Sequence, residues 1–134
     1  MNSRTAHIIQ LPLIQDARGK LSLVEAGEHI PFDIKRVYYL YALAPGATRG
    51  GHAHQNLEQL LIPIAGSFDV CLHDGFSEMR MHLCRPDQGL YLPGRVWRHI
   101  ENFSEGAVCL VLASAAFSEE DYIRDFDQFL KLRQ

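Results

Sequence analysis

The sequence has 134 residues, of which 47% are hydrophobic and 22% are charged, close to the average of a folded soluble domain. Thirteen Lys and Arg residues against sixteen Asp and Glu residues give a formal net charge of -3 without a basic block, which argues against a nucleic-acid partner. No apolar stretch approaches the roughly 20 residues of a membrane helix, and the start lacks the apolar core of a signal peptide, so we expect one cytoplasmic domain with no membrane partner.

Short apolar segments separated by Gly, Pro and Asp make up most of the chain, a pattern that is typical of a sandwich or barrel of strands. In the first half, we expect strands over 8–14 and 20–25, on either side of a turn over 16–19. Residues 34–43 are rich in aromatic and β-branched side chains, which predicts a central strand.

The second half continues the pattern of strands. Residues 59–64 and 67–73 flank Ala65-Gly66 like the two arms of a hairpin. Pro63 indicates an edge position or a bulge, because proline cannot donate a ladder hydrogen bond. Further strands are expected over 79–84, 96–100 and 107–113.

The end of the chain has the pattern of a helix. Ser118 is a good N-cap, and the acidic residues 119–121 suit the positive end of a helix dipole. One apolar stripe follows at helical spacing: Tyr122, Ile123, Phe126, Phe129 and Leu130. We therefore expect one domain over 1–134, with a barrel over about 7–114 and a helix over about 118–131 packed against it.

The cysteines Cys71, Cys84 and Cys109 are odd in number and form no CxxC pair. Each lies in an apolar or strand-like segment, and a cytoplasmic protein keeps its thiols reduced. The sequence therefore predicts three buried free thiols.

Residues 46–66 contain a His-x-His pair, His52 and His54, whose side chains share one face of a strand. The spacing resembles the first motif of the cupins, in which two histidines and a glutamate place three metal ligands inside a small jelly-roll barrel. In the register of that motif's final glycine, Gln59 stands where the carboxylate belongs. Glu58 is one residue out of step, so it should face away.

Residues 93–102 follow the outline of the second cupin motif, with Pro93 and Asn102 in place. Arg98 occupies the position of the fourth metal ligand, a histidine, and the adjacent His99 should point away from the histidine pair. A guanidinium cannot ligate a cation and repels one. The sequence therefore predicts that this barrel holds no metal and no other cofactor.

The two remaining histidines favour proton chemistry. An imidazole, with an ordinary pKa of about 6.5, can take a proton from a carbon next to a carbonyl and return it nearby. A guanidinium, from Arg98 or Arg49, could stabilise the enediolate that forms.

Six segments across nearly the whole chain, 16–19, 31–39, 49–54, 89–91, 96–97 and 121–124, resemble one group of cupins, the 3,4-ketoisomerases that act on dTDP-4-keto-6-deoxyglucose. The resemblance implies an all-β jelly-roll barrel with a C-terminal helix. It implies a metal-independent enzyme that moves the keto group of a dTDP-linked sugar from C4 to C3 through an enediol. The 3-keto product would pass to an aminotransferase in deoxysugar biosynthesis, for lipopolysaccharide or S-layer glycans.

The same resemblance implies roles for single residues. The histidine matching His54 is the family's proposed base between the two carbons, and the one matching His52 assists proton movement between the two oxygens. Family members are homodimers that exchange N-terminal strands, which could carry Arg18 to a neighbouring barrel. Arg18 resembles the members whose product has the galacto configuration at C4 and Arg98 those with the gluco product, so the stereochemistry stays open.

Further substrate contacts are expected around the histidine pair. Arg18, Arg49 and Arg98 suit the sugar or its pyrophosphate, because guanidinium groups bind phosphate oxygens in a bidentate way. Trp97 is a candidate for stacking on the base or sugar, with packing as the alternative.

Two more side chains complete the expected set of pocket residues. Tyr38 and Tyr39 point to opposite faces of one strand, so at most one lines the pocket, and we favour Tyr38. Gln59 joins it from the first cupin motif.

Two other functions remain open from the sequence alone. A metal-dependent small cupin enzyme would need His99 or Glu58 to turn inward, and a nucleotide-sugar-binding cupin without catalysis would use the histidines only as hydrogen-bonding groups. A related epimerase acting at C3 and C5 also uses a cupin barrel, but its His–Asp pairing is not evident in the sequence.

Overall fold

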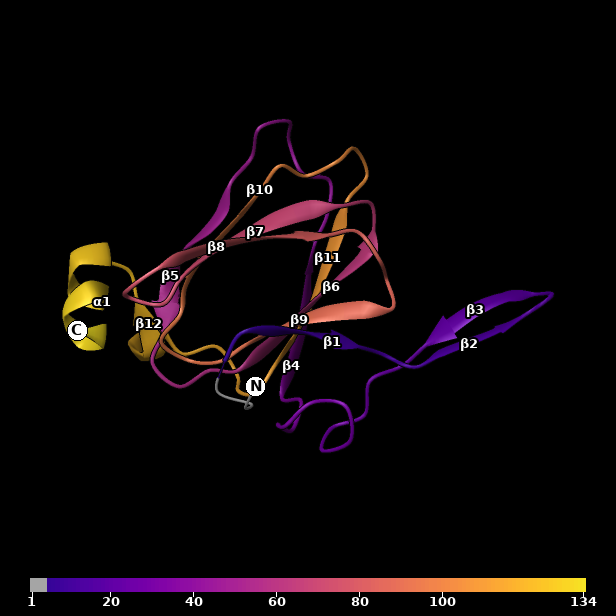
Figure 1. The fold of residues 1–134 in the computed structure, drawn as a ribbon, viewed down its shortest axis with the longest axis horizontal. Coiled ribbons are helices and arrows are strands. Elements are labelled where there is room, and N and C mark those ends of the chain that lie inside the picture. Colours follow the sequence, from indigo (N-terminus) through magenta and orange to yellow (C-terminus); the bar gives the residue numbers. More distant parts are fainter. Residues whose placement is uncertain (1–4) are drawn as a thin grey trace.

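Two antiparallel sheets of five strands face each other in the computed structural model, which describes residues 5–134 (Figure 1). In order across the first sheet, the strands are β1 (His7–Gln10), β9 (Gln88–Leu92), β6 (Gln59–Ala65), β11 (Val108–Ala113) and β4 (Arg36–Leu40). In the second sheet they are β12 (Tyr122–Ile123), β5 (Arg49–His54), β10 (Trp97–Glu101), β7 (Phe68–His73) and β8 (Glu78–Leu83). The predicted all-β fold with a C-terminal helix is confirmed.

Side chains from both sheets fill the space between them. Phe68 and Val70 of β7 and Leu90 of β9 are completely buried, and Val111 of β11 is 1% exposed. Burial of each such side chain is worth about 1.5–3 kcal/mol. Because successive residues alternate faces, this core leaves the inward positions near one end of β5 and β10 available to polar side chains.

The outer face of the first sheet is partly covered as well. Leu60 and Ile62 of β6 point outward and pack against Ile30 and Phe32 from the segment that precedes β4. Because both faces of β6 are buried, its sequence is a continuous run of apolar residues instead of an alternation of apolar and polar ones.

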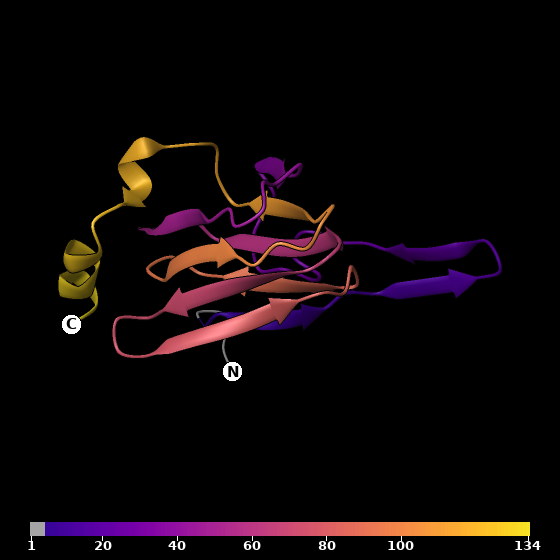
Figure 2. The same ribbon diagram turned by 90° about the horizontal axis from the view of Figure 1, so that it is seen from above.

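The first predicted strand, over 8–14, is divided in the structure. It ends at Gln10, and a separate strand, β2 (Leu13–Asp16), pairs with β3 (Gly19–Ser22) to form a hairpin. Seen from above, this hairpin extends away from the barrel at the end opposite the C-terminal helix (Figure 2). All eight of its strand residues are exposed.

The strand predicted over 34–43 is an edge strand, so the expectation of a central position is wrong. β4 pairs only with β11 among the described strands, and β11 is the one that lies between two neighbours. Val37 and Tyr39 of β4 are 53% and 59% exposed. Aromatic and β-branched composition indicates a strand but cannot tell its place in the sheet.

The predicted hairpin around Ala65-Gly66 is also corrected, because β6 and β7 belong to different sheets. Gly66 has a φ of 66°, and a Cβ there would lie 2.4 Å from the Ser104 hydroxyl oxygen, so the connection needs a glycine. The bulge indicated by Pro63 is confirmed: the pairing with β11 skips Ile64. The paired strands β7 and β8 are joined by a turn at Asp74-Gly75.

The C-terminal helix begins later than predicted. Residues Glu119–Asp121 form a single 3₁₀ turn, and β12 follows, because Tyr122 and Ile123 pair with β5 instead of continuing a helix. Helix α1 (Phe126–Arg133) is capped by the Asp125 carboxylate, which accepts hydrogen bonds from two backbone amides, while the Ser118 side chain makes no cap. The apolar stripe is therefore shared between a strand and a short helix.

The thiols are free as predicted, but not all are buried: Cys109 is buried, Cys71 is half-buried and Cys84 is exposed. No helix in the described part of the chain is long and apolar enough to cross a membrane.

Candidate active site

His52 and His54 lie side by side on β5, as their spacing predicts. Their ring centroids are 4.8 Å apart, and the planes are nearly perpendicular, at 86°. His52 sits opposite Arg98 of β10 in the strand register. Gly50 has a φ of 94° and lies close to the Arg98 carbonyl, so the backbone of β5 approaches β10 where a larger residue would be strained.

Arg98 points into the barrel and is 3% exposed. Its Nε donates to the carbonyl of Val96 at 3.1 Å, and its Nη1 donates to Oε1 of Gln59. Its Nη2 is buried without a hydrogen-bond partner. A buried unpaired donor on a charged group is costly, and Nη2 is therefore a donor that a ligand oxygen in this cavity would satisfy.

Gln59 and Tyr38 extend the same network from the opposite sheet. Gln59, which is 2% exposed, donates from Nε2 to the Tyr38 hydroxyl at 2.9 Å. Burial raises the pKa of Tyr38 above its ordinary value, so the phenol stays protonated. Tyr39 is exposed on the other face, which agrees with the choice of Tyr38 as the residue that points inward.

Five of the eight residues that the sequence predicts for the site line one cavity of about 240 Å³. These are His52, Arg98, Gln59, Tyr38 and Arg49. A second cavity of about 240 Å³ lies next to it and is lined by His54 and Asp121. Arg36 and Tyr122 line both cavities, so these two side chains form the boundary between them.

Both imidazoles are held neutral. Burial, followed by the positive charge of Arg98, lowers the pKa of His52 to about 4. The same two causes, in the same order, lower the pKa of His54 to about 2. Near neutral pH each ring therefore carries one proton and one free lone pair, which is the state a proton acceptor needs.

Sequence reasoning missed Asp121 as a site residue. Its Oδ2 lies 3.2 Å from Nδ1 of His54, and its two carboxylate oxygens also accept the backbone amides of Asn56 and Leu57, at 2.9 and 3.2 Å. The structure thus contains a His–Asp pair, contrary to the expectation from the sequence. The segment 121–124 belongs to the family resemblance, but its acidic and apolar pattern favours the start of a helix and so conceals Asp121 as a partner of His54.

Tyr122 is the second site residue that was missed. Its ring centroid lies 4.8 Å from that of His52 and 4.4 Å from that of His54. The pairing of β12 with β5 places it there, since Tyr122 is the register partner of His54.

Two nominated residues lie outside this site. Trp97 is on the outer face of β10, where its ring packs against Phe126 and Phe129 with centroids 5.2 and 5.7 Å apart. Packing under α1 is therefore its role within this chain. Arg18 lies in the turn between β2 and β3, 91% exposed at its side chain, with an ion pair of 2.6 Å to Asp16.

The residues at the cupin ligand positions do not fit a metal ion. His52 and His54 are neutral imidazoles, but the amide of Gln59 is engaged by Arg98, whose guanidinium brings a positive charge to the fourth position. The metal-dependent alternative also lacks its substitute ligand. His99 points out of the barrel, as predicted, and Glu58 accepts a hydrogen bond from the Tyr91 hydroxyl at 2.7 Å.

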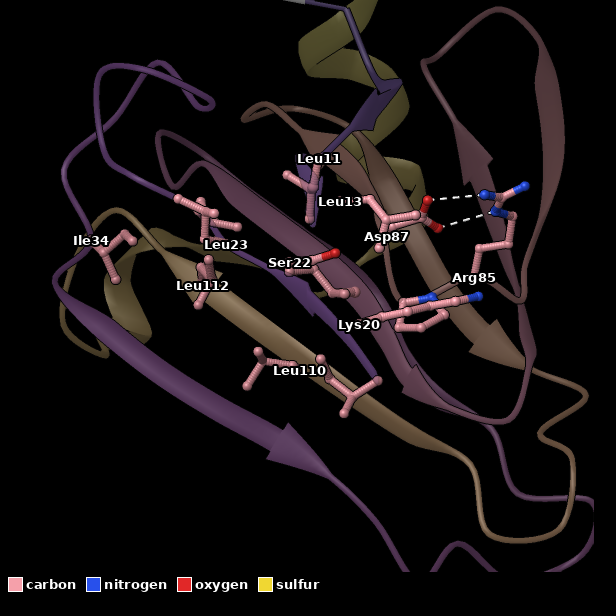
Figure 3. Close-up of a pocket in the computed structure, with 14 residues that line it drawn as sticks. Leu11, Leu13, Lys20, Ser22, Leu23, Ile34, Arg85, Asp87, Leu110 and Leu112 are labelled. Atoms are coloured by element: carbon pink, nitrogen blue, oxygen red, sulfur yellow. Dashed lines mark hydrogen bonds and ion pairs between the residues drawn. The ribbon is translucent and has the colours of Figure 1, made fainter. Parts of the chain in front are cut away.

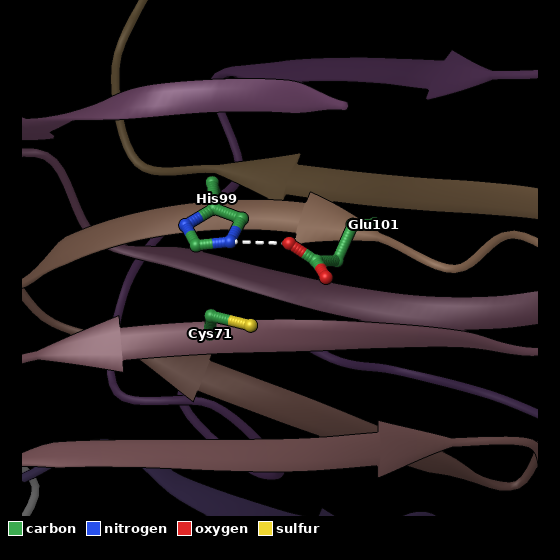
Figure 4. Close-up of side chains that lie close together, drawn as sticks. All are labelled: Cys71, His99 and Glu101. Carbon is green, nitrogen blue, oxygen red and sulfur yellow. Dashed lines mark hydrogen bonds and ion pairs between the residues drawn. The ribbon is translucent and has the colours of Figure 1, made fainter. Parts of the chain in front are cut away.

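On the outer surface, the ligand atoms of Cys71, His99 and Glu101 lie within 4.8 Å of one another (Figure 4). A cation is already present in this cluster, because Arg80 donates to the Cys71 sulfur at 3.1 Å and to Glu101 at 3.0 Å. The His99 ring is bonded to Glu101 at 2.6 Å. The hydrogen-bonding capacity of the cluster is thus met by the protein itself.

A larger cavity, of about 720 Å³, is a groove away from the histidines, where the hairpin joins the barrel (Figure 3). Its walls are mostly leucine, isoleucine and valine, and it contains one ion pair, Arg85 to Asp87 at 2.9 Å. It has no pair of titratable groups suited to proton transfer. Size alone therefore does not mark the chemical site.

Comparison with known proteins gives a consistent set of relatives. The model of the FdtA family, described as WxcM-like, C-terminal, matches residues 4–134. The TDP-4-oxo-6-deoxy-alpha-D-glucose-3,4-oxoisomerase of Aneurinibacillus thermoaerophilus is 43% identical, over 92% of this chain and 89% of that protein.

Solved structures agree with this match. WlaRB, a TDP-quinovose 3,4-ketoisomerase from Campylobacter jejuni, is 46% identical with a TM-score of 0.92, covering 96% of this chain and 98% of that one. QdtA, a sugar 3,4-ketoisomerase from Thermoanaerobacterium thermosaccharolyticum in complex with TDP, is 41% identical with a TM-score of 0.93, covering 96% and 93%. A histidine-to-asparagine variant of QdtA has been solved with TDP-4-keto-6-deoxyglucose.

Proposed function

The chain belongs to the FdtA family, and on that premise we propose that it is a 3,4-ketoisomerase that converts dTDP-4-keto-6-deoxyglucose to a dTDP-3-keto-6-deoxyhexose. The observation that carries the proposal is a pair of neutral imidazoles next to the unpaired, buried Nη2 of Arg98. A keto–enediol isomerisation needs a proton acceptor and a cation at the developing oxyanion, and this site offers both.

The reaction balances within the sugar. A base removes the proton from C3, the electrons of that bond form a C3–C4 double bond, and the C4 carbonyl becomes an enediolate oxygen. Return of the proton to C4, together with transfer of the O3 proton to the enediolate oxygen at C4, then gives a ketone at C3 and a hydroxyl at C4. No oxidant or reductant is consumed, so neutral histidines suffice for all proton transfers.

Arg98 has the geometry to stabilise the enediolate. Two of its donors are fixed by Val96 and Gln59, which leaves Nη2 for a substrate oxygen. The side chain is held before substrate arrives, so little reorganisation accompanies the appearance of negative charge. The Tyr38 hydroxyl, which is tied to Gln59, would add a donor at the same oxygen or at its neighbour.

The cavity geometry bears on the roles of the two histidines. The family resemblance gives the carbon-bound proton to His54, but His52 is the one that shares the cavity of Arg98, whereas His54 is 1% exposed and paired with Asp121. We therefore assign the carbon-bound proton to His52. His54 takes part in proton movement between the two oxygens.

The diphosphate of the substrate is negatively charged and needs cationic partners besides Arg98. Arg49 lines the cavity and is exposed, so it is suited to the diphosphate. Arg18 cannot serve the site of its own chain from the hairpin turn. As a homodimer with exchanged N-terminal strands, the protein would bring Arg18 of each chain to the other barrel.

The surface of the hairpin supports such a dimer. Leu13, Ile14 and Leu21 are 42%, 59% and 55% exposed, which is unfavourable for an isolated hairpin in water. Val37 and Tyr39, on the edge strand β4, are exposed to a similar degree. Contact between these apolar surfaces in two copies would bury both.

The product chemistry places the reaction before an amination. A ketone at C3 is the substrate that a sugar aminotransferase requires, which fits deoxysugar biosynthesis for surface glycans. The substrate is a nucleotide-linked sugar of the cytoplasm, so we expect the protein to act there.

Proton NMR of the sugar signals tests the proposal with chelator-treated protein and dTDP-4-keto-6-deoxyglucose in deuterated water. Appearance of a 3-keto product is expected. Saturable binding of the sugar nucleotide without conversion would overturn the isomerase in favour of a binding cupin. If the protein shows no binding and no conversion, the assigned substrate is overturned as well.

A further inference from the structure

We propose that Asp121 is a positioning residue that holds His54 in one tautomer, with the proton on Nδ1 and the lone pair on Nε2. This inference rests on the proposed function for its catalytic consequence. The geometric part stands by itself, on three contacts of the Asp121 carboxylate.

The direction of the hydrogen bond follows from counting donors. An ionised carboxylate only accepts, and the Asp121 oxygens already accept two backbone amides, those of Asn56 and Leu57. The third partner, Nδ1 of His54, lies 3.2 Å from Oδ2. This nitrogen must therefore be the donor, so a neutral His54 ring has no proton on Nε2.

The carboxylate is itself held firmly. Asp121 belongs to the 3₁₀ turn Glu119–Asp121, its backbone oxygen accepts the amide of Gln55 at 2.7 Å, and the next residue, Tyr122, pairs with His54 in the sheet. Both ends of the contact are thus fixed by the pairing of β12 with β5. His54 is 1% exposed, so water does not compete for Nδ1.

For the reaction, this tautomer makes Nε2 of His54 the nitrogen that can accept a proton. An imidazole that shuttles a proton between two oxygens must start with a free lone pair on the nitrogen that faces the sugar. The opposite tautomer would present an N–H and could not accept. The Asp121 charge also stabilises the imidazolium that exists during the transfer.

The tautomer is measured on the free wild-type protein by ¹⁵N NMR of its histidine side chains, with His54 identified by comparison with His54→Gln. We expect protonated Nδ1 and unprotonated Nε2 at neutral pH. A proton on Nε2 would overturn the inference. This measurement does not depend on turnover. If the wild-type protein is inactive, the proposed function is rejected, but the NMR result still decides whether Asp121 fixes the tautomer of His54.

The variant Asp121→Asn tests the catalytic consequence. Its amide nitrogen can donate to Nδ1, which moves the ring proton to Nε2, and we expect kcat to fall by up to roughly 10⁴-fold, the loss when an asparagine replaces the aspartate that orients a catalytic histidine. Asp125→Asn is the matched control: it removes another carboxylate that accepts backbone amides, at the cap of α1, and should leave tautomer and kcat unchanged.

Should Asp121→Asn be unstable, its far-UV spectrum and thermal transition reveal this, and the wild-type tautomer remains the deciding result. A folded Asp121→Asn protein with unchanged kcat contradicts the positioning role. An equal loss of kcat in Asp125→Asn would also contradict it, because it would show that any loosening of this segment has the same effect.

Discussion

Arg98 donates a hydrogen bond from Nη1 to Oε1 of Gln59, and these two residues occupy the positions of a histidine and a carboxylate in the metal-binding cupin motifs. A pair of potential ligands is thus replaced by a cation and the amide that holds it. His52 and His54 have lowered pKa values, so near neutral pH each ring keeps a lone pair that can accept a proton.

This replacement predicts that metal binding can be restored. The double variant Gln59→Glu/Arg98→His places two imidazoles, a carboxylate and a third imidazole at the motif positions, and we expect it to bind one Ni²⁺ or Zn²⁺ per chain in the barrel. Calorimetry and metal analysis, in a Cys71→Ser background that weakens the surface cluster, should show no such site before the double change. A parent protein with the same barrel-bound metal would contradict the argument from Arg98.

Each histidine of the pair is expected to be required for turnover. His52→Asn and His54→Asn should each lower kcat by at least about 100-fold, the lower bound for loss of a general acid–base group. Binding of dTDP should change little, because neither ring is assigned to the nucleotide. His99→Asn is the control, since His99 lies on the same barrel but faces outward. Full activity of either inner variant would refute the proton shuttle.

Motif spacing and strand alternation are sufficient to predict which side chains point into the barrel near the site. These are His52, His54, Arg98 and Gln59. Asp121 was beyond its reach because it lies 67 residues from His54, and only the pairing of β12 with β5 joins them. The local pattern around Asp121 also favoured a helix, and the sheet overrode that preference.

Positions within the sheets were harder to predict than the strands themselves. The alternation that placed Tyr38 inward could not show that β4 is an edge, or that β6 and β7 lie in different sheets. Trp97 illustrates a related limit. The sequence makes it a candidate for stacking on the base or sugar, but in the structure its ring packs against α1, which begins eight residues later than predicted, at Phe126. These features depend on contacts between distant segments.

The low histidine pKa values predict an unusual pH profile. A base with an ordinary histidine pKa of 6.5 would lose activity below that pH, whereas kcat/KM should here stay level down to about pH 4, where His52 becomes protonated. The measurement is kcat/KM from pH 4 to 8. A midpoint near 6.5 would show that the acting imidazole is not the buried one.

Stability should change between pH 6.5 and pH 4, where activity is expected to stay level. As the pH falls below 6.5 the unfolded chain protonates these histidines, while the folded chain resists down to about pH 4 for His52 and about pH 2 for His54. The free energy of unfolding should therefore decrease as the pH is lowered from 6.5 to 4. Urea unfolding at several pH values checks this, and a smaller decrease is expected for His54→Gln.

Exchange of the hairpin predicts complementation between two defective chains. Arg18→Ala lacks the cation that each chain would deliver, and His54→Asn lacks a residue of its own barrel. A heterodimer made by co-expression with two tags has one barrel with both His54 and the partner's arginine. It should recover up to half the activity of a wild-type dimer, whereas each homodimer stays low. A heterodimer as inactive as its parents would place Arg18 outside the site.

His52 is the histidine that lines the same cavity as Arg98, and this arrangement predicts where the C3 hydrogen of the substrate goes. In the gluco ring, the C3 hydrogen lies on the face opposite the C4 hydrogen that a gluco product would carry. One base working on one face of the enediol therefore returns the proton so that the C4 hydroxyl has the galacto configuration. With C3-deuterated substrate, we expect part of the deuterium at C4 and a galacto coupling pattern by NMR. A gluco product without deuterium would require a second proton donor on the other face, and would contradict a single-base shuttle through His52.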